Sequence, residues 1–132
     1  NNKYIVLDVA GRDSAEFRSA LLIADVLIIP TQPSQTDIEV LPFVLRLVNT
    51  AKQVNKNLKT FVVLNKAPTN NKSTEIDAAL ELLQQVKSVK TLNTILRDRK
   101  QFRDAMIEGK SVLEMGSSKA KDELNEFLVE IL

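Results

Sequence analysis

The sequence contains no cysteine and no histidine, and each absence excludes a class of chemistry. Without cysteine there is no disulfide, thiolate metal site or cysteine nucleophile. Without histidine, a Ser-His-Asp triad and a histidine-ligated metal centre are excluded as well. The remaining composition, 44% hydrophobic and 27% charged, is typical of a globular protein, and 132 residues are enough for one domain with a hydrophobic core.

Glycine and long apolar runs are also scarce. The only glycines are Gly11, Gly109 and Gly116, so the chain contains neither a G-x-G-x-x-G dinucleotide loop nor a G-x-x-x-x-G-K-[ST] phosphate loop. Apolar runs such as residues 26–29 are far shorter than the roughly 20 residues that a membrane-spanning helix needs.

The apolar runs that are present predict strands over residues 4–9, 26–29 and 60–64, with a weaker strand over 91–96. They are continuous rather than alternating, as expected for a parallel sheet covered on both faces. Between and after them, helical periodicity predicts helices, including one over 99–108 and a last one over 119–132. The sequence therefore predicts an α/β fold, a mostly parallel sheet with helices on both faces.

Two of the expected helices carry possible N-terminal capping boxes. Asp13 pairs with Glu16 in the first, and Thr36 with Glu39 in the second. Pro42 lies within the second helical pattern and has no N–H to donate. We therefore expect either a kink at Pro42 or a helix whose regular part begins there.

Polar residues follow the expected strands, at the sheet edge where ligands bind in open α/β folds. Asp8 lies at the end of the first strand with Gly11 shortly after it, and Asn65 and Lys66 follow the third. We expect Asp8, Gly11 and Asn65 to meet at one rim. A strand ending in Asp with Gly nearby is the Walker B arrangement, in which the carboxylate holds Mg²⁺ directly or through water. The alternative is that Asp8 is a turn or cap residue and that Asn65 bonds its own backbone.

A basic segment lies near the predicted last strand, where residues 97–103 include Arg97, Arg99, Lys100 and Arg103. Exposed cations of this kind suit sequence-independent contact with DNA phosphates. The alternative is a solvated face on which these cations pair with neighbouring acidic residues. Residues 119–132 contain two lysines and four acidic residues, so an anionic membrane surface would repel that helix.

Four separated segments together resemble the ParA family of plasmid and chromosome partition ATPases, a group of P-loop proteins that also includes MinD. The segments are VLDVAGRDS at 6–14, ADVLIIPTQPSQTD at 24–37, VVLNKAPTN at 62–70 and ILRDR at 95–99. Their order and spacing agree with the family across nearly the whole chain. The resemblance implies a partial P-loop NTPase-like fold and ATP with Mg²⁺ as cofactors of the intact protein.

The resemblance also implies roles for individual residues. Asp8 would be the catalytic Walker B carboxylate and magnesium ligand, and Gly11 would belong to the switch that senses the γ-phosphate. Asn65, with Lys66 beside it, would read adenine, and the loop over 97–100 would close over the base.

Family members dimerise on binding ATP, bind DNA non-specifically and respond to a ParB-type partner. The resemblance therefore implies a bacterial protein of the cytoplasm, associated with the nucleoid and not with the membrane.

The chain departs from the family at the phosphate loop, which would precede the first expected strand. We therefore expect residues 1–132 to be the C-terminal part of a single ParA-type domain, inactive in ATP hydrolysis on their own. One alternative is a non-catalytic α/β interaction module that binds a partner through the Asp8–Asn65 rim. Another is a MinD-like membrane regulator, which the acidic final helix disfavours.

Overall fold

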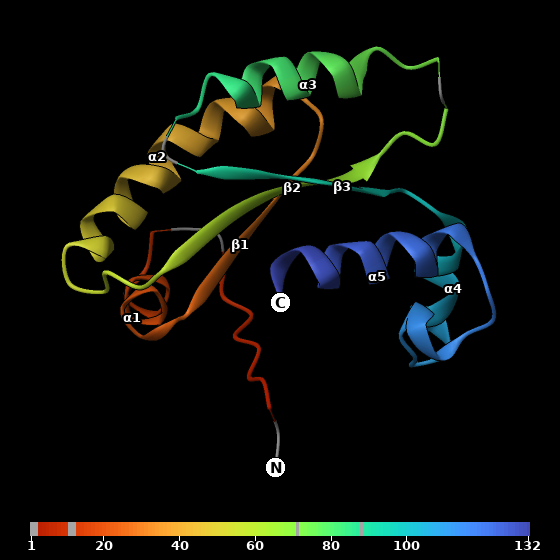
Figure 1. Ribbon diagram of the computed structural model, residues 1–132, viewed down its shortest axis with the longest axis horizontal. Coiled ribbons are helices and arrows are strands. Elements are labelled where there is room, and N and C mark those ends of the chain that lie inside the picture. The colour runs from red at the N-terminus through yellow and green to blue at the C-terminus, as the bar shows by residue number, and fades with distance from the viewer. Residues whose placement is uncertain (1–2, 11–12, 71, 88) are drawn as a thin grey trace.

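The computed structural model describes residues 3–10, 13–70, 72–87 and 89–132. The elements in chain order are α1 (Ala15–Ile23), β1 (Val26–Thr31), α2 (Gln35–Lys52), β2 (Lys59–Ala67), α3 (Glu75–Gln84), β3 (Lys90–Arg97), α4 (Lys100–Ile107), the short 3₁₀ helix η1 (Val112–Glu114) and α5 (Lys119–Ile131). The three strands form one parallel sheet in the order β1-β2-β3 (Figure 1). The predicted α/β class with a parallel sheet is confirmed, and it is consistent with part of a P-loop NTPase fold.

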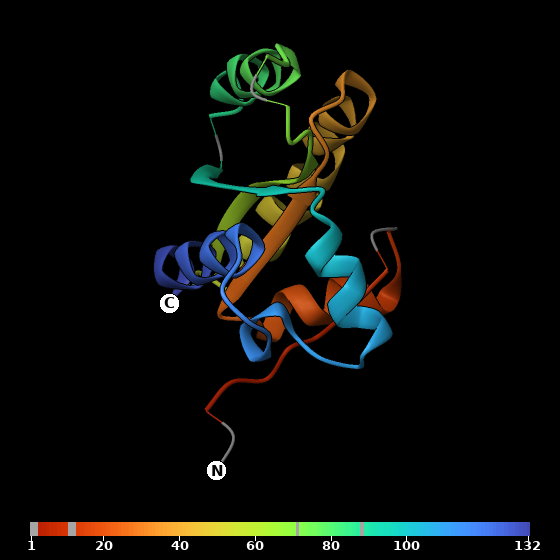
Figure 2. The same ribbon diagram turned by 90° about the vertical axis from the view of Figure 1, so that its right-hand side faces the viewer.

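Helices cover both faces of the sheet. Helices α2 and α3 lie over one face and α5 lies over the other, as the two orthogonal views agree (Figures 1 and 2). On the first face, Val62 and Leu64 of β2 pack in a cluster with residues such as Ile38 and Leu83 from the two helices. Val63 is equally buried although its side chain points to the opposite face. Burial on both faces explains why the run in β2 is continuously apolar.

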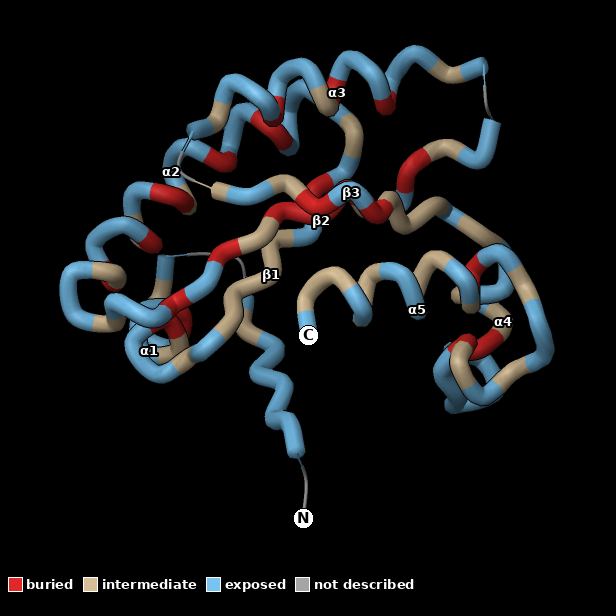
Figure 3. The backbone as a smooth tube through the Cα atoms, in the orientation of Figure 1, coloured by how far each residue is buried: buried red, intermediate tan, exposed pale blue. Residues whose placement is uncertain are grey.

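The buried residues concentrate along β2 and on the inner sides of the helices that cover it (Figure 3). A second cluster joins α1 to the end of α2, where Phe17 and Leu21 pack against Val48 and Ala51. A third and smaller cluster joins α4, η1 and α5 through Ala105, Val112 and Ala120.

The strand predicted over residues 4–9 is not formed. This segment has no regular structure, and its apolar side chains are open to solvent, with Tyr4 58% and Val6 89% exposed. In both ribbon views it runs from the N-terminus apart from the three-stranded sheet (Figures 1 and 2). An apolar run becomes a strand only when another strand satisfies its backbone groups. Within the described residues β1 pairs with β2 alone, and no strand lies on the outer edge of β1.

The other predicted strands are present and longer than predicted. The strand predicted over 26–29 extends through Pro30 to Thr31, paired with Val63 and Leu64 of β2. Proline is tolerated there because β1 is at the edge of this sheet. The strand predicted over 60–64 runs from Lys59 to Ala67, and the strand predicted over 91–96 from Lys90 to Arg97.

The helix boundaries also correct two sequence-based predictions. Neither predicted capping box is formed, because the N-caps are Ser14 and Ser34, whose hydroxyls accept hydrogen bonds from the backbone N–H groups three residues later. Helix α2 begins directly after Ser34 and continues through Pro42, so the expectation that its regular part starts at Pro42 is wrong. Helix α4 agrees with its prediction, and Gly109 follows it with a φ of +65°.

Candidate functional site

The carboxyl ends of β2 and β3 lie side by side and are joined by several contacts. Ala67 and Arg97 are partners in the parallel register. The backbone N–H of Asp98 donates a hydrogen bond of 2.8 Å to the carbonyl of Ala67. The guanidinium of Arg97 donates one of 2.7 Å to the carbonyl of Pro68. We refer to residues 65–68 and 97–99 as the β2–β3 rim.

Asn65 and Lys66 belong to this rim, but they lie inside β2 rather than after it. The pairing register between β2 and β3 shifts between Leu64 and Ala67, and Lys66 has a φ of 52°. A left-handed conformation at a residue other than glycine is uncommon, and bulges of this kind redirect side chains near functional sites. Lys66 is exposed and Asn65 half-buried. The bulge thus presents an amide and an ammonium group at the edge where a ligand is expected.

The chemistry of Asn65 fits one part of a nucleotide. A carboxamide offers both donors and an acceptor, which matches the adjacent donor and acceptor on the edge of adenine. The exposed ammonium of Lys66 beside it adds a positive charge. These residues fit a base. The chain has no glycine-rich loop to cradle phosphates, since its three glycines stand singly at positions 11, 109 and 116.

Asp8 is not in contact with this rim. Asp8 is exposed, within the segment that forms no strand. Its neighbour Val9 packs against the cluster around Phe17, in which neither Asn65 nor Lys66 takes part. Gly11 lies outside the described residues. In the part of the chain that the structure describes, no three acidic side chains gather around a common point. Mg²⁺ needs only one or two carboxylates beside water and phosphate oxygens, and the exposed carboxylate of Asp8 suits that chemistry.

An apolar groove lies along the free edge of β1. Its lining includes Val9, Leu27 and Ile29 from the strand side, and Val40 and Val44 from α2. The groove is open because no strand covers the outer edge of β1 among the described residues.

The four basic residues of the predicted DNA surface have different surroundings. Arg97 and Arg99 are half-buried, and both contact the carboxylate of Glu123 on α5. Lys100 and Arg103 are on the exposed side of α4, paired with Asp104 and Asp98 respectively. The observed contacts therefore agree better with the alternative, a surface on which these cations pair with acidic residues. Exposed ion pairs of this kind are weak and exchange readily with other partners.

Two glutamates of α5 make contacts that the sequence analysis missed. Glu123 accepts a hydrogen bond of 3.1 Å from the backbone N–H of Arg97 and two shorter ones from the guanidinium of Arg99. Glu130 accepts hydrogen bonds from the backbone N–H groups of Asn93 and Thr94 and from both of their side chains. The two glutamates are seven residues apart and so lie on one side of α5. That spacing is the feature of the sequence that could have indicated their shared contact with β3.

The contacts of Glu130 alter its ionisation. Burial acts to raise the pKa of Glu130, but the N–H groups of Asn93 and Thr94, the Thr94 hydroxyl and the charge of Lys90 outweigh it and lower the pKa below its usual value. The ionised carboxylate therefore accepts from two consecutive backbone N–H groups of β3. Helix α5 is thus held against β3, whereas no strand lies on the outer edge of β1 among the described residues.

No helix within the described ranges is long and apolar enough to cross a bilayer.

The comparisons with known proteins identify one relative. The chain is 28% identical over its whole length to the Maintenance of carboxysome distribution protein A of Halothiobacillus neapolitanus, and it spans 61% of that protein's length. No protein-family model matches the chain. The similarity over every residue confirms the family resemblance that the four motifs indicated.

Proposed function

We propose that this chain, which is homologous over its whole length to a ParA-family protein, supplies the adenine-reading part of an ATPase that distributes a cargo within the bacterial cell. The observation that carries the proposal is the bulge at Asn65 and Lys66, located on the strand edge where this family resemblance requires a base-reading amide. In the intact protein, Asn65 and Lys66 contact the base and the 97–100 loop lies over it.

We propose the remaining properties of the family for the intact protein. They are ATP-dependent dimerisation, non-specific DNA binding over the nucleoid and stimulation by a ParB-type partner. Asp8 remains the proposed magnesium carboxylate and Gly11 the proposed phosphate sensor.

The proposed cargo is a large assembly. The name of the relative refers to carboxysome distribution, and the family resemblance refers to plasmids and chromosomes. Each is a large body that must be distributed within the cell, so we propose that class of activity for the intact protein.

Nucleotide titration of the full-length protein, with ATP and GTP in the presence of Mg²⁺, tests the proposal. We expect ATP to bind and GTP to bind more weakly. Asn65→Ala should reduce the preference for ATP about tenfold, since a site built to hydrogen-bond one base loses selectivity when the bonding group is removed. Asn57→Ala is the matched control, because Asn57 is an exposed asparagine in the turn before β2 and should leave the preference unchanged.

The second candidate is the non-catalytic interaction module. The observation that favours it is the open apolar groove beside β1. If the full-length protein binds neither nucleotide, the ATPase proposal is wrong and the interaction module becomes the better interpretation.

A further inference from the structure

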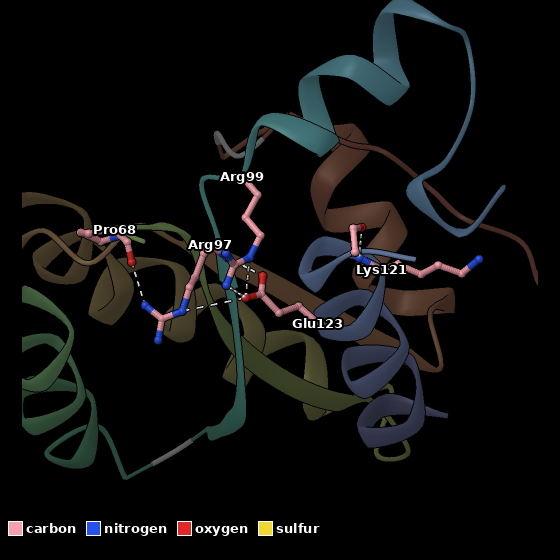
Figure 4. A network of polar contacts seen from close by, with 6 residues as sticks. Pro68, Arg97, Arg99, Lys121 and Glu123 are labelled. Atoms are coloured by element: carbon pink, nitrogen blue, oxygen red, sulfur yellow. Dashed lines mark hydrogen bonds and ion pairs between the residues drawn. The ribbon is translucent and has the colours of Figure 1, made fainter. Parts of the chain in front are cut away.

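A single carboxylate on α5 contacts the β2–β3 rim at several points (Figure 4). One oxygen of Glu123 accepts hydrogen bonds of 2.8 and 2.6 Å from Nε and Nη2 of Arg99. The other oxygen accepts one of 3.1 Å from the backbone N–H of Arg97. The last residue of β3 and the residue that precedes α4 are therefore both held by the same side chain.

The guanidinium of Arg97 extends this set of contacts to the neighbouring strand. Its Nε lies 3.9 Å from Oε1 of Glu123, and its Nη1 donates a hydrogen bond of 2.7 Å to the carbonyl of Pro68. Pro68 follows the bulge at Asn65 and Lys66 by two residues. As Figure 4 shows, Arg97 lies between Glu123 and Pro68 and so connects α5 to the segment that carries the base-reading residues.

These groups are shielded from solvent, which makes the contacts stronger than those of a surface pair. The side chains of Glu123, Arg97 and Arg99 are only 13%, 23% and 18% exposed. Hydrogen bonds between charged groups are stronger than neutral ones, and removing one charge of a shielded pair leaves the other without compensation. Without the Glu123 charge, the Arg99 guanidinium would lose both of these hydrogen bonds, and the Arg97 guanidinium would lose its neighbouring negative charge.

We propose that Glu123 is a positioning residue for base recognition: it holds Arg97 and Arg99 so that the segment containing Asn65 and Lys66 has one geometry. This inference rests on the proposed function, because it assumes that the rim reads a base. Glu123 itself does not touch the nucleotide. Its contribution is to preorganise the side chains that do.

The chain provides a matched control in Glu130. It is a glutamate on the same helix, it also accepts hydrogen bonds from the backbone of β3, and it is seven residues from Glu123. Its contacts are to Asn93 and Thr94, in the middle of β3, away from the end of the strand that forms the rim. Both glutamates stabilise the packing of α5 on β3, but only Glu123 contacts the rim.

The experiment compares Glu123→Gln and Glu130→Gln with the unchanged full-length protein. For each, we would measure the affinities for ATP, GTP and inorganic tripolyphosphate, together with the midpoint of thermal unfolding. We expect Glu123→Gln to weaken ATP binding about tenfold and to reduce the ATP-to-GTP preference by a similar factor. Tripolyphosphate binding should change less than about twofold, because it does not use the base-reading rim. Glu130→Gln should leave all three affinities unchanged while it lowers the unfolding midpoint.

A second variant keeps the test valid if Glu123→Gln does not fold. Arg97→Lys retains the positive charge but loses the planar group that joins Glu123 to the Pro68 carbonyl. We expect it to reduce the same preference in the same direction.

The outcomes separate the two proposals. An unchanged ATP-to-GTP preference in both Glu123→Gln and Arg97→Lys would overturn the positioning role and leave the proposed function standing. An equal loss in Glu130→Gln would also overturn it, because the effect would then follow stability alone. If the unchanged protein shows no preference for ATP, the proposed function fails and the positioning role fails with it.

Discussion

At the scale of single residues, Glu130 shows how one carboxylate can attach a helix to a strand. Backbone donors that the sheet leaves unpaired need other acceptors. Glu130 reaches from α5 and accepts bonds from two consecutive N–H groups of β3. The acidic side of α5 therefore has a structural purpose that its composition alone does not reveal.

The lowered pKa of Glu130 leads to a prediction about acid stability. A carboxyl group whose pKa is lower in the folded protein stabilises the fold above its unfolded pKa, and that contribution is lost as the pH falls through the folded value. We expect Glu130→Gln to reduce the free energy of unfolding by about 1 kcal/mol at neutral pH. Urea unfolding from pH 7 down past the usual value of 4.5 measures this.

The difference between Glu130→Gln and the unchanged protein should shrink as the pH falls below that value. If the difference in unfolding free energy stays constant across the acid range, the ionised form of Glu130 is not what stabilises its contact with β3.

At the scale of elements, the start of α2 depends on which hydroxyl faces the free N–H groups of its first turn. Ser34 has an extended backbone, with φ −125° and ψ 146°, and its hydroxyl accepts from the N–H of Asp37 at 3.2 Å. Thr36, the residue favoured by the capping-box pattern, is already inside the helix. An N-cap needs the non-helical backbone of the residue just before the first turn, and Ser34 has it.

This assignment predicts different outcomes for two similar substitutions. Ser34→Ala should lower the free energy of unfolding by about 1 kcal/mol, since it removes the cap. Thr36→Ala is the control and should change it by no more than about 0.5 kcal/mol, because alanine is favourable inside a helix. Equilibrium denaturation of both variants gives the comparison. If Thr36→Ala lowers the free energy of unfolding more than Ser34→Ala does, the capping box of Thr36 and Glu39 marks the start of α2 instead.

At the scale of the whole molecule, the sheet is packed between helices but open on one side. α5 packs on β3 over one face, whereas the described residues leave the outer edge of β1 and its groove open (Figures 1 and 2). The exposed apolar segment at residues 4–7 belongs to the same incomplete side. The open edge agrees with the family resemblance, which implies a further central strand that is not among the strands described.

The distribution of charge over the molecule leads to a prediction about DNA. Arg97 and Arg99 are held by Glu123, so their substitution would disturb the rim as well as the charge. Lys100 and Arg103 do not contact Glu123; their exposed side chains pair with Asp104 and Asp98. Replacing both with alanine in the full-length protein should weaken non-specific DNA binding about tenfold and reduce the slope of log affinity against log salt by up to about 2.

Replacement of Lys56 and Lys59 with alanine is the control for this experiment. Both are exposed, at the amino end of β2. An equal reduction of the salt slope by this pair would place the DNA surface elsewhere on the molecule and reject the one proposed on α4.

Particular residues show how far the site could be predicted from the sequence. Asn65 and Lys66 are predicted to follow a strand directly, and they lie within its last three residues. The prediction is close because apolar runs and the polar residues that follow them are local patterns. The bulge at Lys66 was not predictable, since it arises from a register shift between two strands. The pairing of Arg99 with Glu123 joins residues 24 positions apart, and no local pattern reports such a contact.

The sequence by itself determined the α/β class, the approximate positions of three strands and five helices, and the absence of histidine, cysteine and phosphate-loop chemistry from these 132 residues. These follow from periodicity and composition, which each segment carries independently of the others. Only the tertiary structure decided that residues 4–9 form no strand and that Glu123 and Glu130 bind β3. A strand requires a partner and a carboxylate requires donors, and the fold alone determines which distant groups come within reach.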